Sequence, residues 1–155
     1  MSEQAATRET GRSEAVEDYV RAILHTARGP RRVASTTPVA SFLGVTPTSV
    51  SGMFKKLARL ELVTYVPYRG VSLTPAGQLL ALRLTRRQRL LVSFLAETLD
   101  VSVERISVEA DLLAHHVSPE LEELIAARVG DPPLGPDGDA PPAADAAPPT
   151  RTSLR

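Results

Sequence analysis

The residues best suited to chemistry lie between Thr46 and Leu60, in the string TPTSVSGMFKKLARL. Small hydroxyl side chains come first and cations follow, namely Thr48, Ser49, Ser51, Lys55, Lys56 and Arg59. Hydroxyl groups can hydrogen-bond to base edges, while lysine and arginine neutralise backbone phosphates. This order predicts a helix in a DNA major groove, with hydroxyls at base edges or nearby phosphates and cations on the DNA backbone.

The same stretch carries the local signals of an amphipathic helix. Thr46 is a favourable N-cap, and Pro47 occupies the first helical position, where its missing N–H costs nothing. Val50, Phe54 and Leu57 recur at i, i+4 and i+7, which gives one apolar face. The hydroxyls and cations are therefore expected on the opposite face, free of the core.

Two short β-rich runs follow this helix, at residues 62–66 and 71–73. The loop between them contains Pro and Gly, which favour a tight hairpin turn, and it places Arg69 at the tip. A basic helix followed by a small basic hairpin is typical of a winged helix-turn-helix. We therefore expect Arg69 to contact DNA from the wing.

Two alternatives remain open for this basic surface. It is either an ordinary α+β packing element with solvated lysines, or a winged-helix protein-interaction module that docks an acidic partner. The first rarely places cations on both a helix and a loop tip. The hydroxyl-rich front of the helix argues against the second.

The preceding residues supply the other helices of such a domain. Apolar spacing predicts a first helix over residues 13–27. Thr37 is placed to cap a short second helix, and Gly44 makes the tight turn into the helix described above. Residues 13–75 are therefore expected to form the winged helix-turn-helix, preceded by a disordered segment at 1–12.

The later residues predict an all-helical dimerisation domain at 76–129, so the fold class is mainly α. Helices are expected from Thr74 to about residue 99, over 103–116 and over 119–129. Candidate core or dimer contacts on the last two helices are Ile106, Leu113, Val117, Leu121, Leu124 and Ile125. The composition of residues 130–155, rich in Pro, Ala, Gly and Asp, predicts a disordered tail.

The net charge of zero conceals a segregation of charge along the 155 residues. Residues 12–99 hold 13 Lys or Arg and 5 Asp or Glu, whereas residues 100–150 hold 2 and 11. A cationic first part suits nucleic-acid binding. The absence of cysteine excludes disulfides and thiolate metal sites. With no membrane-length apolar run and no signal-peptide core, we expect a cytoplasmic protein.

The sequence resembles the diphtheria-toxin-repressor family of iron- and manganese-dependent transcriptional regulators. The matching strings are EDYVRAIL (17–24), VASFLGVTPTSVSGMFKKLARLELV (39–63), YRGVSLTPAG (68–77), and RRQRLL (86–91) at its spacing from HHVSPELEEL (115–124). The resemblance implies the two-domain, manganese-responsive form without an SH3-like domain, acting as a homodimer on a palindromic operator in double-stranded DNA. Glu61 stands where the family more often has Gly.

The same resemblance implies a switch operated by Mn²⁺ or Fe²⁺. Ligands are retained at the positions matching Asp18, Asp111 and His115, the last two of which share a helical face at i and i+4. Other ligand positions are changed, since Gln88 and Ala114 replace a histidine and a glutamate. A divalent site prefers about six donors, including water. One weak metal site formed by these three residues and water is therefore one of the two alternatives.

An alternative is regulation without metal. Arg21 replaces a carboxylate of the manganese-responsive branch and lies one helical turn from Asp18. A guanidinium remains charged, so it can substitute electrostatically for a bound cation. A metal-dependent hydrolase built on Asp111, His115 and His116 would need a further ligand and a general base, neither of which is evident. We therefore do not expect an enzyme.

Overall fold

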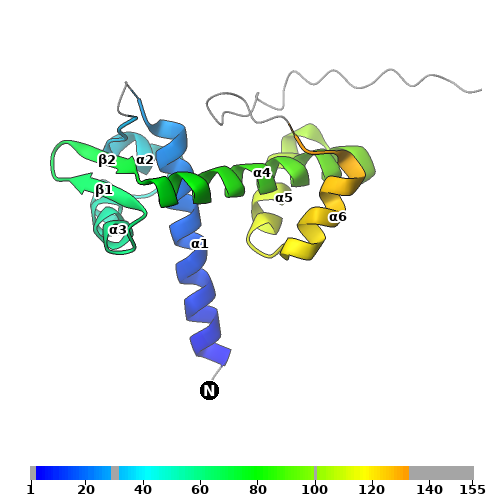
Figure 1. The fold of residues 1–155 in the computed structure, drawn as a ribbon, viewed down its shortest axis with the longest axis horizontal. Coiled ribbons are helices and arrows are strands. Elements are labelled where there is room, and N and C mark those ends of the chain that lie inside the picture. The colour runs from blue at the N-terminus through cyan, green and yellow to red at the C-terminus, as the bar shows by residue number, and fades with distance from the viewer. Residues whose placement is uncertain (1–2, 29–31, 100, 133–155) are drawn as a thin grey trace, which may run out of the picture. The chain divides into compact units, whose positions relative to one another are not determined.

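A computed structural model describes residues 3–28, 32–99 and 101–132 (Figure 1). The elements, in chain order, are α1 (Glu3–Thr26), α2 (Thr36–Leu43), α3 (Pro47–Arg59), β1 (Val63–Val66), β2 (Gly70–Leu73), α4 (Pro75–Thr98), α5 (Val103–Ala114) and α6 (Pro119–Val129). The chain forms two compact units, Met1–Arg87 and Gln88–Arg155, that divide within α4. The predicted mainly helical fold with a winged helix-turn-helix is confirmed.

The first unit places α3 against a small antiparallel hairpin. In the hairpin, Val63 of β1 pairs with Leu73 of β2, and Val66 pairs with Gly70 at the other end. The rings of Phe54 and Tyr65 lie 5.5 Å apart between centroids, so α3 packs directly on β1. This packing fixes the position of the hairpin beside the helix that carries the predicted DNA contacts.

A third stretch of extended chain joins this hairpin. Ala34, between α1 and α2, exchanges two backbone hydrogen bonds with Val71 at 2.8 and 2.9 Å. Around it lies a core of fully buried side chains from α1, α2, α3 and β2, namely Val20, Ile23, Val39, Val50, Phe54, Leu57 and Val71. The predicted apolar face of α3 is thus confirmed.

The connection from α2 to α3 has the predicted form. Gly44 adopts a left-handed conformation with φ of 66°, which a side chain would strain. Thr46 caps α3, because its hydroxyl accepts the amide of Ser49 at 3.3 Å. These two residues set the direction in which the helix leaves the turn.

Two helix starts differ from the predictions. The first helix was expected at Ser13 after a disordered segment, whereas α1 begins at Glu3. Residues 3–12 are mostly good helix formers, so the helix continues through them although they have no apolar face. The second helix begins at Thr36, so the predicted cap residue Thr37 lies inside it. Ser35 takes the N-cap position, but its side chain makes no capping hydrogen bond.

The end of α3 forms a closed C-terminal cap. The amide of Leu62 donates to the carbonyl of Leu57 at 3.1 Å, and that of Glu61 donates to Ala58 at 3.0 Å. This pair of bonds is a Schellman motif, which requires a left-handed residue just past the helix. Glu61 occupies that position with φ of 58°, although glycine is the residue that adopts it without strain.

The start of α4 is joined to the same corner. The hydroxyl of Thr74 donates to the carbonyl of Glu61 at 2.7 Å and accepts the amide of Gly77 at 3.1 Å. A Cβ atom at Gly77 would collide with the carbonyl of Leu62. The close approach of α4 to the end of α3 therefore depends on glycine.

The second unit is a small helical cluster around its own core. The buried residues are Leu90, Leu91 and Leu95 of α4, Ala110 and Ala114 of α5, and Ile125 of α6. The hydroxyl of Ser118 caps α6 by accepting the amide of Leu121 at 3.2 Å. Of the tail predicted at 130–155, residues 133–155 lie outside the described residues.

We predict that Glu61→Gly stabilises the protein, because the left-handed backbone costs a non-glycine residue about 1–2 kcal/mol. Part of that gain is offset by the greater entropy of unfolded glycine, leaving about 0.5–1 kcal/mol. Thermal unfolding should therefore show a higher Tm.

Gly77→Ala at the same corner is the matched control, and overpacking there should cost about 1–3 kcal/mol. A Tm that fell with Glu61→Gly would contradict this account of the corner.

Candidate nucleic-acid interface

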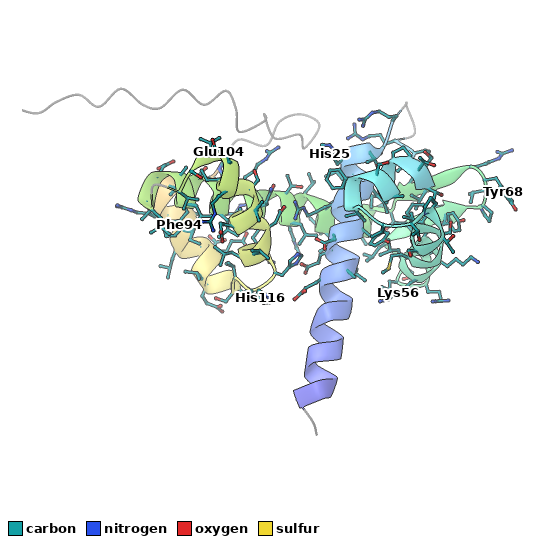
Figure 2. The ribbon with its side chains drawn as sticks, turned by 180° about the vertical axis from the view of Figure 1, so that it is seen from behind. His25, Lys56, Tyr68, Phe94, Glu104 and His116 are labelled. Atoms are coloured by element: carbon teal, nitrogen blue, oxygen red, sulfur yellow. The ribbon has the colours of Figure 1, made fainter. Side chains whose placement is uncertain are left out.

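The outward face of α3 is polar and basic. At 100° per residue, Thr48, Lys55 and Arg59 lie opposite the buried stripe, and all three are exposed. Lys56 is half-buried beside them, and Figure 2 labels it on α3. The predicted cations are thus displayed along one side of a helix whose other side is fixed in the core.

The hydroxyl residues at the front of α3 differ in what they already bind. The hydroxyls of Thr46 and Ser49 share a hydrogen bond of 2.9 Å. The side chain of Thr48 is exposed to solvent. Ser51 is half-buried and donates to the carbonyl of Pro47 at 3.2 Å. Its oxygen keeps an accepting lone pair, so Ser51 is better placed to accept than to donate.

One residue of this face, Gly52, has no role in the sequence-based prediction. It lies in the middle of α3, exposed, with nothing within 4 Å of where a Cβ atom would stand. Glycine inside a helix costs about 0.5–1 kcal/mol relative to alanine. Because the fold places no steric demand there, the bare backbone leaves room for a close neighbour outside the protein. In the sequence, the signal for such a bare position is a glycine among polar residues that face outward.

The wing ends in a tight turn with Arg69 exposed at its tip. The amide of Arg69 donates to the carbonyl of Val66 at 3.0 Å, which closes the turn. Tyr68 precedes it and is the most exposed large apolar residue of those described, as Figure 2 indicates at the far end of the hairpin. The predicted position of Arg69 at the tip is confirmed, whereas its contact with DNA stays a prediction.

Arg28, just after α1, has a local structural role. Its guanidinium Nη1 donates to the carbonyls of His25 and Ala27 at 2.9 and 3.0 Å. These bonds satisfy carbonyls at the helix end, where a positive charge is also favourable. His25 itself is exposed, and its ring lies 4.7 Å from that of Phe42.

The residues predicted to bind metal come from both units. Asp18 lies on α1 in the first, whereas Asp111 lies on α5 in the second with His115 one turn later. All three are half-buried. Over the described ranges, no group of three or more His, Asp or Glu side chains is arranged to hold a metal ion. This ligand set stays a prediction.

The donor types nevertheless fit the metals that were predicted. Two carboxylates and one imidazole are ligands that Mn²⁺ and Fe²⁺ accept. Their number is small, because Ala114 is buried without a donor atom and Arg21 brings a cation to α1. Beside Asp18, burial raises the pKa of the Tyr19 phenol, so this residue stays neutral.

Residues 12–71 match the N-terminal DNA binding domain of the iron dependent repressor family. Residues 74–143 match the metal binding and dimerisation domain of the same family. The chain belongs to the iron dependent repressor family. Its resemblance to the diphtheria-toxin-repressor regulators is thereby confirmed.

Known relatives agree with this assignment. The chain is 37% identical over 113 residues to the transcriptional regulator MntR of Escherichia coli, covering 73% of this chain and 72% of that one. It is 35% identical over 113 residues to an uncharacterized HTH-type transcriptional regulator of Methanocaldococcus jannaschii, covering 73% and 90%. These relatives are named as regulators, not as enzymes.

Solved structures show the same fold. A manganese-dependent transcriptional repressor in complex with manganese aligns with a TM-score of 0.68 and 33% identity, over 76% of this chain and 53% of that one. IdeR of T. acidophilum aligns with a TM-score of 0.64 and 25% identity, over 81% and 62%. This chain thus spans about half the length of the first of these structures. Within the described part of the chain, none of the helices has the length and apolar character of a membrane span.

Proposed function

We propose that this protein is a sequence-specific DNA-binding transcriptional regulator, acting as a repressor and as a homodimer on a palindromic operator. The observation that carries the proposal is the outward face of α3, where hydroxyls and cations stand opposite a stripe buried in the core. The family match to a DNA binding domain over the same residues supports it.

In this proposal α3 lies in the major groove with its N-terminal turn toward the bases. Thr48, Ser49 and Ser51 then contact base edges or nearby phosphates, and they supply the sequence preference. Lys55, Lys56 and Arg59 contact phosphates, as does Arg69 from the wing. The cationic character of the first unit raises affinity for every duplex, and it makes that affinity depend on salt.

We predict that Lys56→Ala or Arg59→Ala weakens binding by a similar factor on all duplexes. Each change removes one phosphate contact, so the slope of log K against log salt should become shallower by about 0.9. Gel shifts over a salt series, on duplexes selected by the wild-type protein, measure both effects.

Arg128→Ala on α6, an exposed cation in the second unit, is the matched control and should leave the slope unchanged. If all three variants kept the wild-type slope, Lys56 and Arg59 would not be on phosphate.

The dimer contact that we propose lies on α5. Ile106, Ala110 and Ala114 are buried on one side of this helix. On the other side, Val108 and Leu112 are 60% and 62% exposed. Two large apolar side chains at i and i+4, opposite the core, form an apolar stripe that a second copy can cover. The family's dimerisation domain over these residues supports that choice.

We predict that Leu112→Asp shifts the protein from dimer to monomer, because dimerisation would bury an unpaired carboxylate. Sedimentation velocity measures the change, and far-UV circular dichroism checks that the helices persist. Val66→Asp introduces the same charge at an exposed apolar residue of the wing; it is the control and should leave the dimer intact. A Leu112→Asp protein that sedimented like the wild type would place the dimer contact elsewhere.

We further propose that Asp18, Asp111 and His115 hold Mn²⁺ or Fe²⁺, with water completing the coordination. A bound dication would supply the positive charge that carboxylate ligands favour. The family description, which names iron, and the manganese complex of a similar repressor support the proposal. In the competing proposal Arg21 provides that charge permanently, since it lies one turn from Asp18 on α1.

We predict that isothermal titration with Mn²⁺ gives stoichiometric binding that Asp111→Ala removes. DNA affinity should then rise on addition of Mn²⁺ after chelation. If the wild-type protein binds no metal and keeps full DNA affinity in chelator, metal control is absent. In that case Arg21→Glu should lower DNA affinity in chelator. Because no metal is bound under those conditions, the loss would come from Arg21 itself and not from a damaged metal site.

A further inference from the structure

Gly52, in the middle of α3, is a glycine that the fold does not require. Gly44 and Gly70 adopt positive φ, and at Gly77 a Cβ atom would collide with a backbone carbonyl. Neither condition holds at Gly52, because the residue is helical and nothing lies within 4 Å of its Cβ position. Alanine would be the better helix former there. The reason for a glycine must therefore lie in what α3 contacts outside the chain.

Gly52 occupies the centre of the face that α3 turns away from the core. At 100° per residue it lies almost directly opposite the buried stripe of this helix. Thr48 stands one turn before it, and Lys56, which Figure 2 labels, stands one turn after it. The outward face therefore has a bare position between longer side chains, which we call the α3 notch.

The α3 notch offers no hydrogen-bonding group to an occupant. Inside an α-helix each N–H donates to the carbonyl four residues earlier, so the amide and the carbonyl of Gly52 are engaged within the helix. A phosphate oxygen or a polar base edge placed there would lose water without gaining a partner, which is unfavourable. The missing Cβ atom instead leaves room for an apolar group of methyl size. In the major groove that group is the C5-methyl of thymine.

We propose that the α3 notch receives the C5-methyl group of a thymine, which makes Gly52 a specificity-determining residue. This inference rests on the DNA binding proposed above. A helix about 10–12 Å across fills a major groove about 12 Å wide, so the centre of the outward face comes nearest to the groove floor. A methyl carbon in contact with the Cα atom of Gly52 would lie about 3.5–4.0 Å away, and a Cβ atom would crowd it. Thymine is thus selected by fit, whereas the hydroxyls at the front of α3 select by hydrogen bonding.

The test combines Gly52→Ala with removal of the methyl group from the DNA. Duplexes selected from a random library by the wild-type protein are remade with deoxyuridine in place of thymidine, one position of each half-site at a time. At one position the wild-type protein should lose about three- to fivefold in affinity, the value of one buried methyl group. Gly52→Ala should bind the thymine duplex roughly tenfold more weakly than the wild type does, because the notch is overpacked. It should prefer deoxyuridine at that position, where the alanine methyl replaces the thymine methyl.

Thermal unfolding checks that the variant is folded. Gly52→Ala should raise Tm by about 2–4 °C, because alanine replaces glycine inside a helix. Ser107→Ala, at an exposed position inside α5, is the matched control. It also gains helix propensity, but it should leave the DNA affinity and the preference for thymine unchanged. A more stable protein that binds the thymine duplex more weakly excludes misfolding as the cause.

The outcomes separate this inference from the proposed function. If Gly52→Ala binds the thymine duplex as tightly as the wild type, or discriminates thymine from deoxyuridine as the wild type does at every position, the notch inference is wrong and the proposed function stands. The same holds if the wild-type protein is indifferent to every deoxyuridine substitution. If the wild-type protein selects no duplex, both are wrong.

Discussion

The anchoring of α3 by its apolar stripe is the constraint on which the rest of the structure depends. Val50, Phe54 and Leu57 are fully buried, so the helix cannot rotate about its axis without exposing them. Burying each such side chain contributes about 1.5–3 kcal/mol. The polar and basic side chains on the opposite face are consequently held outward in one orientation. A flexible basic segment would bind nucleic acid too, but without the fixed geometry that base recognition needs.

Both ends of α3 are fixed by specific backbone geometry. Gly44 and Thr46 fix its entry, while the Schellman motif at Glu61 and the hydrogen bonds of Thr74 fix its exit. The exit is formed with a strained glutamate, and the wing with a strained tyrosine. The wing that we assign to DNA thus departs from the most stable choice of residue, as functional surfaces often do.

The sequence predicted the parts of this arrangement that are encoded by neighbouring residues. The cap at Thr46, the turn at Gly44 and the amphipathic pattern of α3 depend on residues a few positions apart, and local rules therefore recover them. The true start of α1 has no such signal, because good helix formers without an apolar face also suit a disordered segment. The helix-end hydrogen bonds of Arg28 and the positive φ of Tyr68 are features that only folding reveals. The metal ligands were inferred by resemblance and remain predictions.

The central claim is that a rigid basic face, carried twice by a two-fold dimer, reads double-stranded DNA. Selection of duplexes from a random library, followed by hydroxyl-radical footprinting, tests this claim most directly. Our account predicts an enriched palindrome with two protected half-sites whose centres are separated by about one helical turn, 10–10.5 base pairs, or a multiple of it. Failure to enrich any duplex at low salt, or protection of a single unpaired site by a monomer, would contradict it.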